Sequence, residues 1–434
     1  MDIAGARWFA GKGRGGRVRG AQPLGWYQPP GAHEPGVRSE ILRIDYPDGV
    51  PEYYHTLDSY RRAPVSGVPA EPAADPSLGY RRDATRDPEA MAVLLQALSH
   101  ATEDLGPEPG CWRVVLRHPE LLAGAGPARL IAGEQSNSTI LFGDSLAMKL
   151  FRRLEPGRSL DVARHEMLAQ AGNTDVDALV GWVSARLGGS TTPFETDLMM
   201  ITAQVPAARD GWELACEAAA EGRELSGQLA ELGRALARIH QALTQAEPTH
   251  TLPREELITR VGGRIDAAAA VVPQVATHRE ALMRILTRIT TPDITTQAIH
   301  GDFHLGQTLW GSRGWTIIDF EGEPLTPRTQ RQAPDSPWRD VAGIMRSLDY
   351  AGAATGRPDD PDVRTWVARA GRAFLAGYCH GQLSFEQRVL LDAYLVDKVC
   401  YEVVYETRER PAWATIPLHA LTVMAQAEPG TDSR

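Results

Sequence analysis

The chain has 434 residues, a formal net charge of −10 and 43% apolar residues. This length indicates two or three domains, the composition is that of an ordinary water-soluble protein, and the acidity argues against a nucleic-acid partner, which would need a basic face. No N-terminal stretch resembles a signal peptide and no segment is long enough to span a bilayer, so we expect a cytoplasmic protein without a membrane partner. The sequence does not fix the oligomeric state, and a monomer is compatible with it.

The first part of the chain, residues 1–105, is expected to be a cap subdomain of short strands and one or two helices. Residues 39–46 and 52–57 alternate loosely between apolar and polar side chains on either side of a Tyr-Pro-Asp-Gly turn, which predicts a pair of strands. A helix is predicted over residues 88–100, because apolar residues recur there on one face: Met91, Leu94, Leu95 and Leu98.

Residues 106–205 are expected to form a small nucleotide-binding lobe. A polar turn that contains Ser136 lies between two short apolar segments, and such a turn can bring backbone N–H groups close to phosphates. The next predicted strand carries Lys149 in an apolar setting, which is costly unless the ammonium meets an anion. Lys149 is therefore a candidate phosphate-binding residue, although a lysine that faces solvent from an edge strand would show the same pattern.

Residues 206–434 are expected to form a larger, mostly helical part. Apolar residues three and four positions apart predict an amphipathic helix that ends before Pro248: Leu229, Leu232, Leu236, Ile239 and Leu243. One or two more helices are expected over residues 255–290, and another begins near Ser336.

The stretch 297–323 holds the densest group of reactive side chains. A tight loop carries Asp302, and after a Gly-rich turn an apolar run predicts a buried strand that ends in Asp319. Two carboxylates placed in this way suit phosphoryl transfer, in which one accepts the proton of an attacking hydroxyl and the other holds magnesium. Gln307 offers a neutral oxygen ligand for the same cation. The alternative is a hairpin with a few surface acids.

A predicted helix near the C-terminus, about 383–408, is unusual because aromatic and acidic residues gather on one side of it: Tyr394, Tyr401, Glu402, Tyr405 and Glu406, with Lys398 among them. Aromatic faces and carboxylates suit the C–H groups and hydroxyls of a sugar, and Trp413 just beyond the helix is placed to close such a pocket. The alternative is an ordinary helix with a Lys398–Glu402 ion pair one turn apart.

Two of these segments resemble known motifs. The loop His-Gly-Asp-x-His-Leu-Gly-Gln resembles the catalytic loop of protein-kinase-like phosphotransferases, and Ile-Asp-Phe-Glu-Gly-Glu-Pro resembles their magnesium motif. With Gln307 in place of the usual Asn and Glu321 in place of Gly, the two motifs are similar to those of maltokinases and related actinobacterial sugar kinases. The resemblance implies an α+β, bilobal protein-kinase-like fold with an N-terminal cap, in which ATP binds between the lobes and the acceptor binds beside the larger lobe.

The resemblance also implies a role for individual residues. Asp302 would be the catalytic base, Gln307 and Asp319 would hold Mg²⁺, and Lys149 would grip the ATP phosphates while paired with Glu166. Ser136 would face the phosphates, and Gln204 and Val205 would form the hinge that binds adenine. Asp340 would steady the catalytic loop. Asp302 and six further residues would contact the acceptor: His304, Glu321, Glu402, Tyr405, Glu406 and Trp413.

The acceptor is left open among several sugars. Maltokinases make maltose 1-phosphate, and the related glucosamine kinases make glucosamine 6-phosphate. Trp310 and Trp338 stand where a maltokinase is expected to have Arg and Leu, so they would shrink a disaccharide pocket, and an acidic cluster around Glu402 would suit an amine. These features favour glucosamine over maltose. An aminoglycoside-type antibiotic kinase is a third possibility, and a catalytically inactive nucleotide-binding protein is disfavoured because Lys149, Asp302 and Asp319 are all present.

Overall fold

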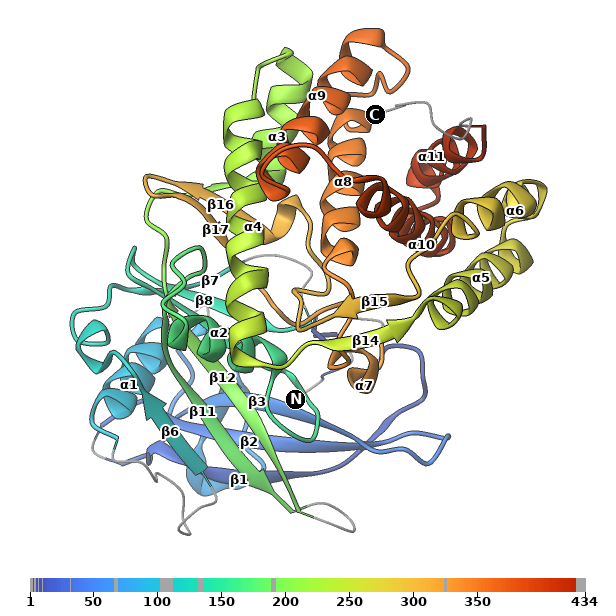
Figure 1. Cartoon of the computed structure of the whole chain (residues 1–434). Coiled ribbons are helices and arrows are strands. Elements are labelled where there is room, and N and C mark those ends of the chain that lie inside the picture. Colours follow the sequence, from blue (N-terminus) through green and yellow to red (C-terminus); the bar gives the residue numbers. More distant parts are fainter. Residues whose placement is uncertain are drawn as a thin grey trace. The chain divides into compact units, whose positions relative to one another are not determined.

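The computed structural model describes residues 1–434 except 1–2, 4, 7, 10, 32, 66–68, 102–111, 132–135, 189–192, 324–325 and 427–434. The chain has a mixed α+β architecture, as the sequence predicted (Figure 1). It divides into two compact units, the first made of Met1–Glu166 and Asp177–Pro206 and the second of Met167–Val176 and Ala207–Arg434. The predicted boundary near residue 105 lies outside the described residues, so the division into cap, small lobe and helical lobe stays a prediction.

The first unit contains two antiparallel sheets. In one of them the strands run in the order β1 (Arg17–Gln28), β2 (Gly36–Asp45), β3 (Glu52–Arg61), β5 (Tyr80–Asp83) and β4 (Glu71–Pro72). The predicted strand pair is β2 and β3, in which Leu42 lies opposite Tyr54. The predicted helix is α1 (Pro88–Ser99), which begins where the side chain of Asp87 accepts a hydrogen bond from the Ala90 N–H.

The second sheet of this unit has the order β6 (Trp112–Leu116), β11 (Leu179–Leu187), β12 (Phe194–Ala203), β9 (Leu146–Leu150), β8 (Ser138–Phe142) and β7 (Ala128–Leu130). One buried apolar core, which includes Leu57 and Met148, joins the two sheets. The short β10 (Arg153–Leu154) pairs with β3, and the fully buried Arg152 beside it forms an ion pair of 3.0 Å with Asp83. The sheets of the first unit therefore share one interior.

The second unit is built mainly from helices: α3 (Gly211–Glu221), α4 (Ser226–Ala246), α5 (Arg254–Val271), α6 (Pro273–Leu286), α7 (Arg328–Arg331), α8 (Trp338–Ala353), α9 (Pro361–Tyr378), α10 (Phe385–Glu409) and α11 (Thr415–Gln426). Their apolar faces meet in one core that also covers the hairpin of β16 (Thr308–Gly311) and β17 (Gly314–Ile317). The unit also contains the short strands β13 (Arg209–Asp210), β14 (His250–Pro253) and β15 (Asp293–Thr296). The helix α2 (Leu160–Gln170) is divided between the two units. Its residues up to Glu166 belong to the first unit, and its residues from Met167 belong to the second.

Most of the predicted helices are confirmed within two or three residues, and the stretch 255–290 proves to be two helices, α5 and α6. The long α10 begins with a capping box, in which Ser384 and Gln387 exchange side-chain to backbone hydrogen bonds. Among the described residues, no helix combines the length and apolar character needed to cross a membrane.

Candidate active site

Asp340 on α8 fixes the loop of the second unit that carries His300, Gly301 and Asp302. Its two carboxylate oxygens accept hydrogen bonds from the backbone N–H groups of His300 and Gly301 at 2.8 and 2.9 Å, and His240 on α4 contacts the same carboxylate at 2.9 Å. Burial alone would raise the pKa of Asp340, but these hydrogen bonds and the nearby histidines hold it below its usual value. The predicted steadying role of Asp340 is thus borne out by its contacts.

The imidazole of His300 ties the loop to the strand that follows it. Its Nε2 lies 3.0 Å from the carbonyl oxygen of Ile318, an acceptor, so this nitrogen carries the proton and Nδ1 accepts the N–H of Asp302 at 3.3 Å. At Gly301, where φ is +88°, an added Cβ would lie 3.3 Å from the Cα of Gly322, so the two loops approach closely. Asp302 and Asp319 therefore come from one tightly connected pair of loops.

The two carboxylate oxygens of Asp302 have different neighbours. Oδ1 lies 3.3 Å from the ammonium of Lys398, which comes from α10, and Oδ2 lies 4.0 Å from Nε2 of His304. About a fifth of the Asp302 side chain is exposed, at 20%. One carboxylate oxygen is thus fixed by a cation, and the other lies near His304 but beyond hydrogen-bond distance from it.

Lys398 is itself part of a buried ion-pair network. Its Nζ lies 2.8 Å from Glu323, which also contacts Arg339 at 2.9 Å, and Arg339 continues to Asp335 at 3.0 Å. Burial alone would raise the pKa of Glu323, but Lys398 and Arg339 lower it to about 2. Neither residue was given a role from the sequence, although Glu323 lies within the predicted magnesium motif and Arg339 directly precedes Asp340.

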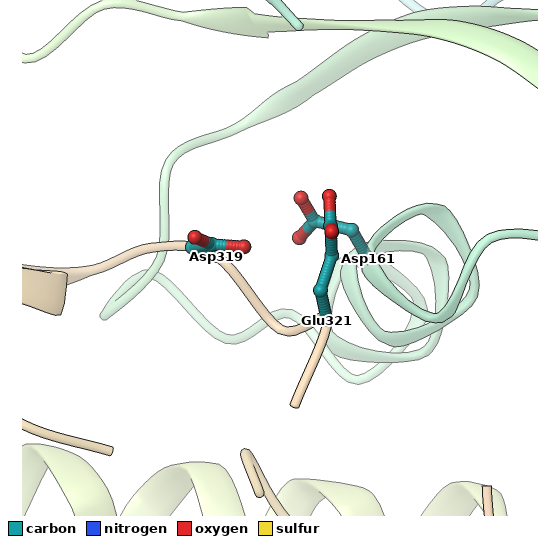
Figure 2. A group of neighbouring side chains, drawn as sticks. All are labelled: Asp161, Asp319 and Glu321. Carbon is teal, nitrogen blue, oxygen red and sulfur yellow. The ribbon is translucent and has the colours of Figure 1, made fainter. Parts of the chain in front are cut away.

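The predicted magnesium ligands also lie together in this unit. Nε2 of Gln307 donates to Oδ2 of Asp319 at 3.1 Å, which leaves the amide oxygen of Gln307 available. Figure 2 shows Asp319 and Glu321 on one stretch of chain, and carboxylate oxygens of the two lie within 4.8 Å of each other. Asp319 has φ +67°, a rare conformation for a residue with a side chain, of the kind that gathers at functional sites. A set of two carboxylates and one amide oxygen fits a hard cation such as Mg²⁺.

The acidic residues predicted to meet the acceptor are already engaged within the second unit. Glu402 is buried and accepts from Nε of Arg346 at 2.8 Å, and Arg346 also pairs with Asp349. Glu406 is buried and contacts both Arg410 and the hydroxyl of Tyr350. The sequence pattern could not show the pair of Glu402 with Arg346, which lies 56 positions away, whereas Arg410 lies one helical turn after Glu406. The acceptor roles of Glu402 and Glu406 remain predictions, and any acceptor must share them with an arginine.

The aromatic residues of this region stack on one another. Trp413 lies parallel to Tyr350, with ring centroids 6.0 Å apart, and Tyr405 lies parallel to Tyr401 at 6.1 Å. Two other tryptophans have a packing role that the sequence did not predict. Trp338 is buried against Tyr378 in the core, and Trp310 packs edge-on against Trp315 at 5.0 Å. The idea that Trp338 narrows a sugar pocket is therefore wrong, because its ring is used inside the helical core.

In the first unit, Lys149 has a partner, but not the predicted one. Lys149 lies on β9, between β12 and β8, so the alternative of an edge strand is excluded. Its Nζ is 2.7 Å from Oδ2 of Asp161 on the first turn of α2, the residue shown in Figure 2. Glu166 instead pairs with Arg117 at 2.8 Å and with Arg158. The prediction of a Lys149–Glu166 pair was wrong, because Asp161 in the first turn of the helix faces the strand, whereas Glu166 faces these two partly exposed arginines.

Three further residues were predicted to bind the nucleotide: Ser136, Gln204 and Val205. Ser136 is exposed, and the neighbouring part of the predicted phosphate turn, residues 132–135, lies outside the described residues. Gln204 and Val205 follow the end of β12, and the Gln204 N–H donates to the carbonyl of Ser145 at 2.8 Å. The side-chain oxygen of Gln204 is buried without a hydrogen-bond partner among the described residues. Their role in binding adenine stays a prediction.

Comparisons with known proteins agree on one family. The model of the phosphotransferase enzyme family matches residues 127–388. A glucosamine kinase of Streptacidiphilus jiangxiensis is 30% identical over 342 residues, which cover 70% of this chain and 75% of that protein. A glucosamine kinase of Mycolicibacterium smegmatis is 25% identical over 321 residues, 68% of this chain and 79% of that one.

Solved structures extend this likeness to the fold. A glucosamine kinase in complex with glucosamine, ADP and inorganic phosphate superposes with a TM-score of 0.68 and 23% identity, and the match covers 94% of each chain. A second crystal form of a glucosamine kinase also gives a TM-score of 0.68, at 21% identity over 93% of each chain. At these identities the structural likeness shows the fold alone.

Proposed function

Since the chain belongs to the phosphotransferase enzyme family, we propose that the hydroxyl it phosphorylates with ATP is that of glucosamine, giving glucosamine 6-phosphate. The observation that carries this proposal is the arrangement around Asp302, whose carboxylate is fixed by Lys398 on one oxygen and left open on the other. The two relatives named glucosamine kinase support glucosamine as the acceptor, in preference to maltose.

Asp302 would orient the attacking hydroxyl and accept its proton. Phosphoryl transfer passes through a loose transition state, so its rate depends less on the basicity of this carboxylate than on its exact position. Two sets of contacts supply that precision. Asp340 accepts hydrogen bonds from the loop and so fixes its backbone, and Lys398 forms an ion pair with Asp302 that fixes one carboxylate oxygen of Asp302. The oxygen on the His304 side is then the one that meets the acceptor.

Asp319 and Gln307 would hold Mg²⁺, with Glu321 beside them. When bound, the metal neutralises charge on the phosphates of the nucleotide. The hydrogen bond from Gln307 to Asp319 orients both side chains, so that the amide oxygen of Gln307 and the carboxylate of Asp319 would face the cation together. Lys149 would contact the nucleotide phosphates from the first unit, and Ser136, Gln204 and Val205 would complete that side.

The ammonium of glucosamine needs a nearby excess of negative charge. Glu402 and Asp349 share a single guanidinium, that of Arg346, so with both carboxyl groups ionised the three residues carry one net negative charge. Asp349 is half-buried, whereas Glu402 is buried, and burial raises the pKa of Glu402. We expect this group to attract the amine, with Tyr405 and Trp413 as neighbouring sugar contacts. A cytoplasmic location and a monomeric state remain further parts of the proposal.

The test is ATP-dependent phosphorylation of a panel of glucosamine, glucose, maltose, N-acetylglucosamine and kanamycin, with Asp302→Asn as the control. We expect glucosamine to be preferred and the rate to fall about 10³-fold in the variant. Preference for maltose or kanamycin would keep the phosphotransferase reaction and overturn the acceptor. An undiminished rate in Asp302→Asn would overturn the assignment of the base.

A further inference from the structure

A chain of alternating charges extends from Lys149 into the interior of the first unit. Nζ of Lys149 contacts Oδ2 of Asp161 at 2.7 Å, and Oδ1 of Asp161 contacts Nδ1 of His165 one turn later on α2, at 3.1 Å. Nε2 of His165 then contacts Oδ1 of Asp177 at 2.8 Å. Asp177 lies just before β11, so the four residues connect β9, α2 and the approach to β11. The side chains of Asp161 and His165 are each only 1% exposed.

The contacts of His165 indicate that its ring is positively charged. Nδ1 faces the carbonyl and a carboxylate oxygen of Asp161, and Nε2 faces the carboxylate of Asp177. These neighbours accept hydrogen bonds, and a neutral imidazole has only one N–H to give. Burial alone would lower the pKa of His165, but Asp177 and Asp161 raise it well above its ordinary value.

We propose that His165 and Asp177 are positioning residues that hold the Lys149–Asp161 pair ready for the phosphates of the nucleotide. This inference deepens the proposed function and depends on the phosphate-binding role assigned there to Lys149. Neither His165 nor Asp177 belongs to the motifs recognised in the sequence, and the partner expected for Lys149 was Glu166.

The physical reason lies in how the charge of Asp161 is shared. A lysine paired with one carboxylate presents little net charge to an incoming anion. The imidazolium of His165 draws on the same carboxylate, so the pair keeps Asp161 in place while more of the positive charge of Lys149 is left for a phosphate. Asp177 in turn fixes the ring of His165, as an outer hydrogen-bond partner orients a ligand-holding histidine elsewhere.

The experiment measures Mg·ADP binding by calorimetry and the initial rates of the full-length protein, for His165→Gln and Asp177→Asn. We expect the Kd for ADP and the KM for ATP to rise about tenfold in His165→Gln and about threefold in Asp177→Asn. The KM for glucosamine should stay within about twofold in both, since a positioning role on the nucleotide side does not touch the acceptor.

His55→Gln is the matched control. His55 is another fully buried histidine of the first unit, and its ring contacts Ser39 rather than Lys149 or Asp161. Thermal unfolding of all three variants measures their loss of stability. At equal loss, only His165→Gln and Asp177→Asn should weaken ADP binding. Equal weakening in His55→Gln, or unchanged ADP binding in folded His165→Gln, would overturn the proposal. Because ADP binding needs no acceptor, a failure to phosphorylate glucosamine would leave this test decisive.

Discussion

Two partly buried lysines, one in each unit, form ion pairs of different kinds. Lys149 lies on a central strand and Lys398 on a long helix, and their side chains are 16% and 19% exposed. Lys149 contacts the carboxylate of Asp161, which His165 also contacts, and we propose that this pair binds an anionic ligand. Lys398 bridges two carboxylates, those of Asp302 and Glu323, and we propose that it fixes the orientation of Asp302. Two lysines of similar exposure would thus serve ligand binding in one unit and orientation of a carboxylate in the other.

The sharpest way to separate these roles is to remove the charge of Lys398. We expect Lys398→Met to lower kcat about 10²-fold while the KM for ATP changes less than about twofold, because Asp302 loses the contact that fixes it. Lys398→Arg, which keeps the charge, should recover part of the loss. Steady-state kinetics check this, with the exposed Arg408→Met on the same helix as the control. A loss confined to the KM for ATP would place Lys398 on the nucleotide side.

The second prediction concerns the partner of Lys149. Asp161→Asn should raise the KM for ATP about tenfold, because Lys149 then loses its charged partner in a buried site. Glu166→Gln should change it less than about twofold, because Glu166 pairs with partly exposed arginines, and such pairs contribute little. Initial rates at varied ATP distinguish the two, and the reverse ranking would restore the pairing expected from the sequence.

The smallest expected effect is a difference in pH dependence between the two units. The pKa of His165 is raised, so its contribution to stability is present below the ordinary histidine pKa and is lost as pH rises through the folded value. The pKa of Asp335 is lowered, against the effect of burial, chiefly by Arg260 and Arg339, so its contribution is present above the ordinary aspartate value and is lost as pH falls.

Urea unfolding of the wild type, His165→Gln and Asp335→Asn at pH 3, 7 and 9 checks these signs. The stability lost in Asp335→Asn, about 2 kcal/mol at pH 7, should shrink at pH 3, which lies below the ordinary aspartate pKa. The stability lost in His165→Gln should be larger at pH 3 than at pH 9. The same pH trend in both variants would contradict the opposite charge states assigned to the two networks.

The sequence was most informative where a residue broke a local pattern. A lysine within an apolar strand and two carboxylates beside a short buried strand are rare enough to notice, and their resemblance to kinase motifs predicted the fold. Lys398 attracted less attention because a lysine on an amphipathic helix is ordinary, and its contact with Asp302 joins residues 96 positions apart. Side-chain pairing at that separation is decided by tertiary packing.

The same limit explains the errors. Glu166 and Asp161 lie on the same helix, and only the direction in which α2 presents its faces decides which of them meets Lys149. Trp338 was predicted to line the sugar pocket because it replaces a smaller residue expected in maltokinases, yet it packs on Tyr378 in the core. The pairing of Glu402 with Arg346 was equally hidden, since helix spacing shows which residues share a face and not what faces them.

The most direct test of the central claim is the phosphorus NMR spectrum of the product formed from ATP and glucosamine. Transfer to the hydroxymethyl oxygen gives a phosphomonoester signal split into a triplet by two methylene protons, and this signal should be absent with Asp302→Asn. A doublet from a phosphate on the anomeric carbon, or inorganic phosphate alone, would contradict the account.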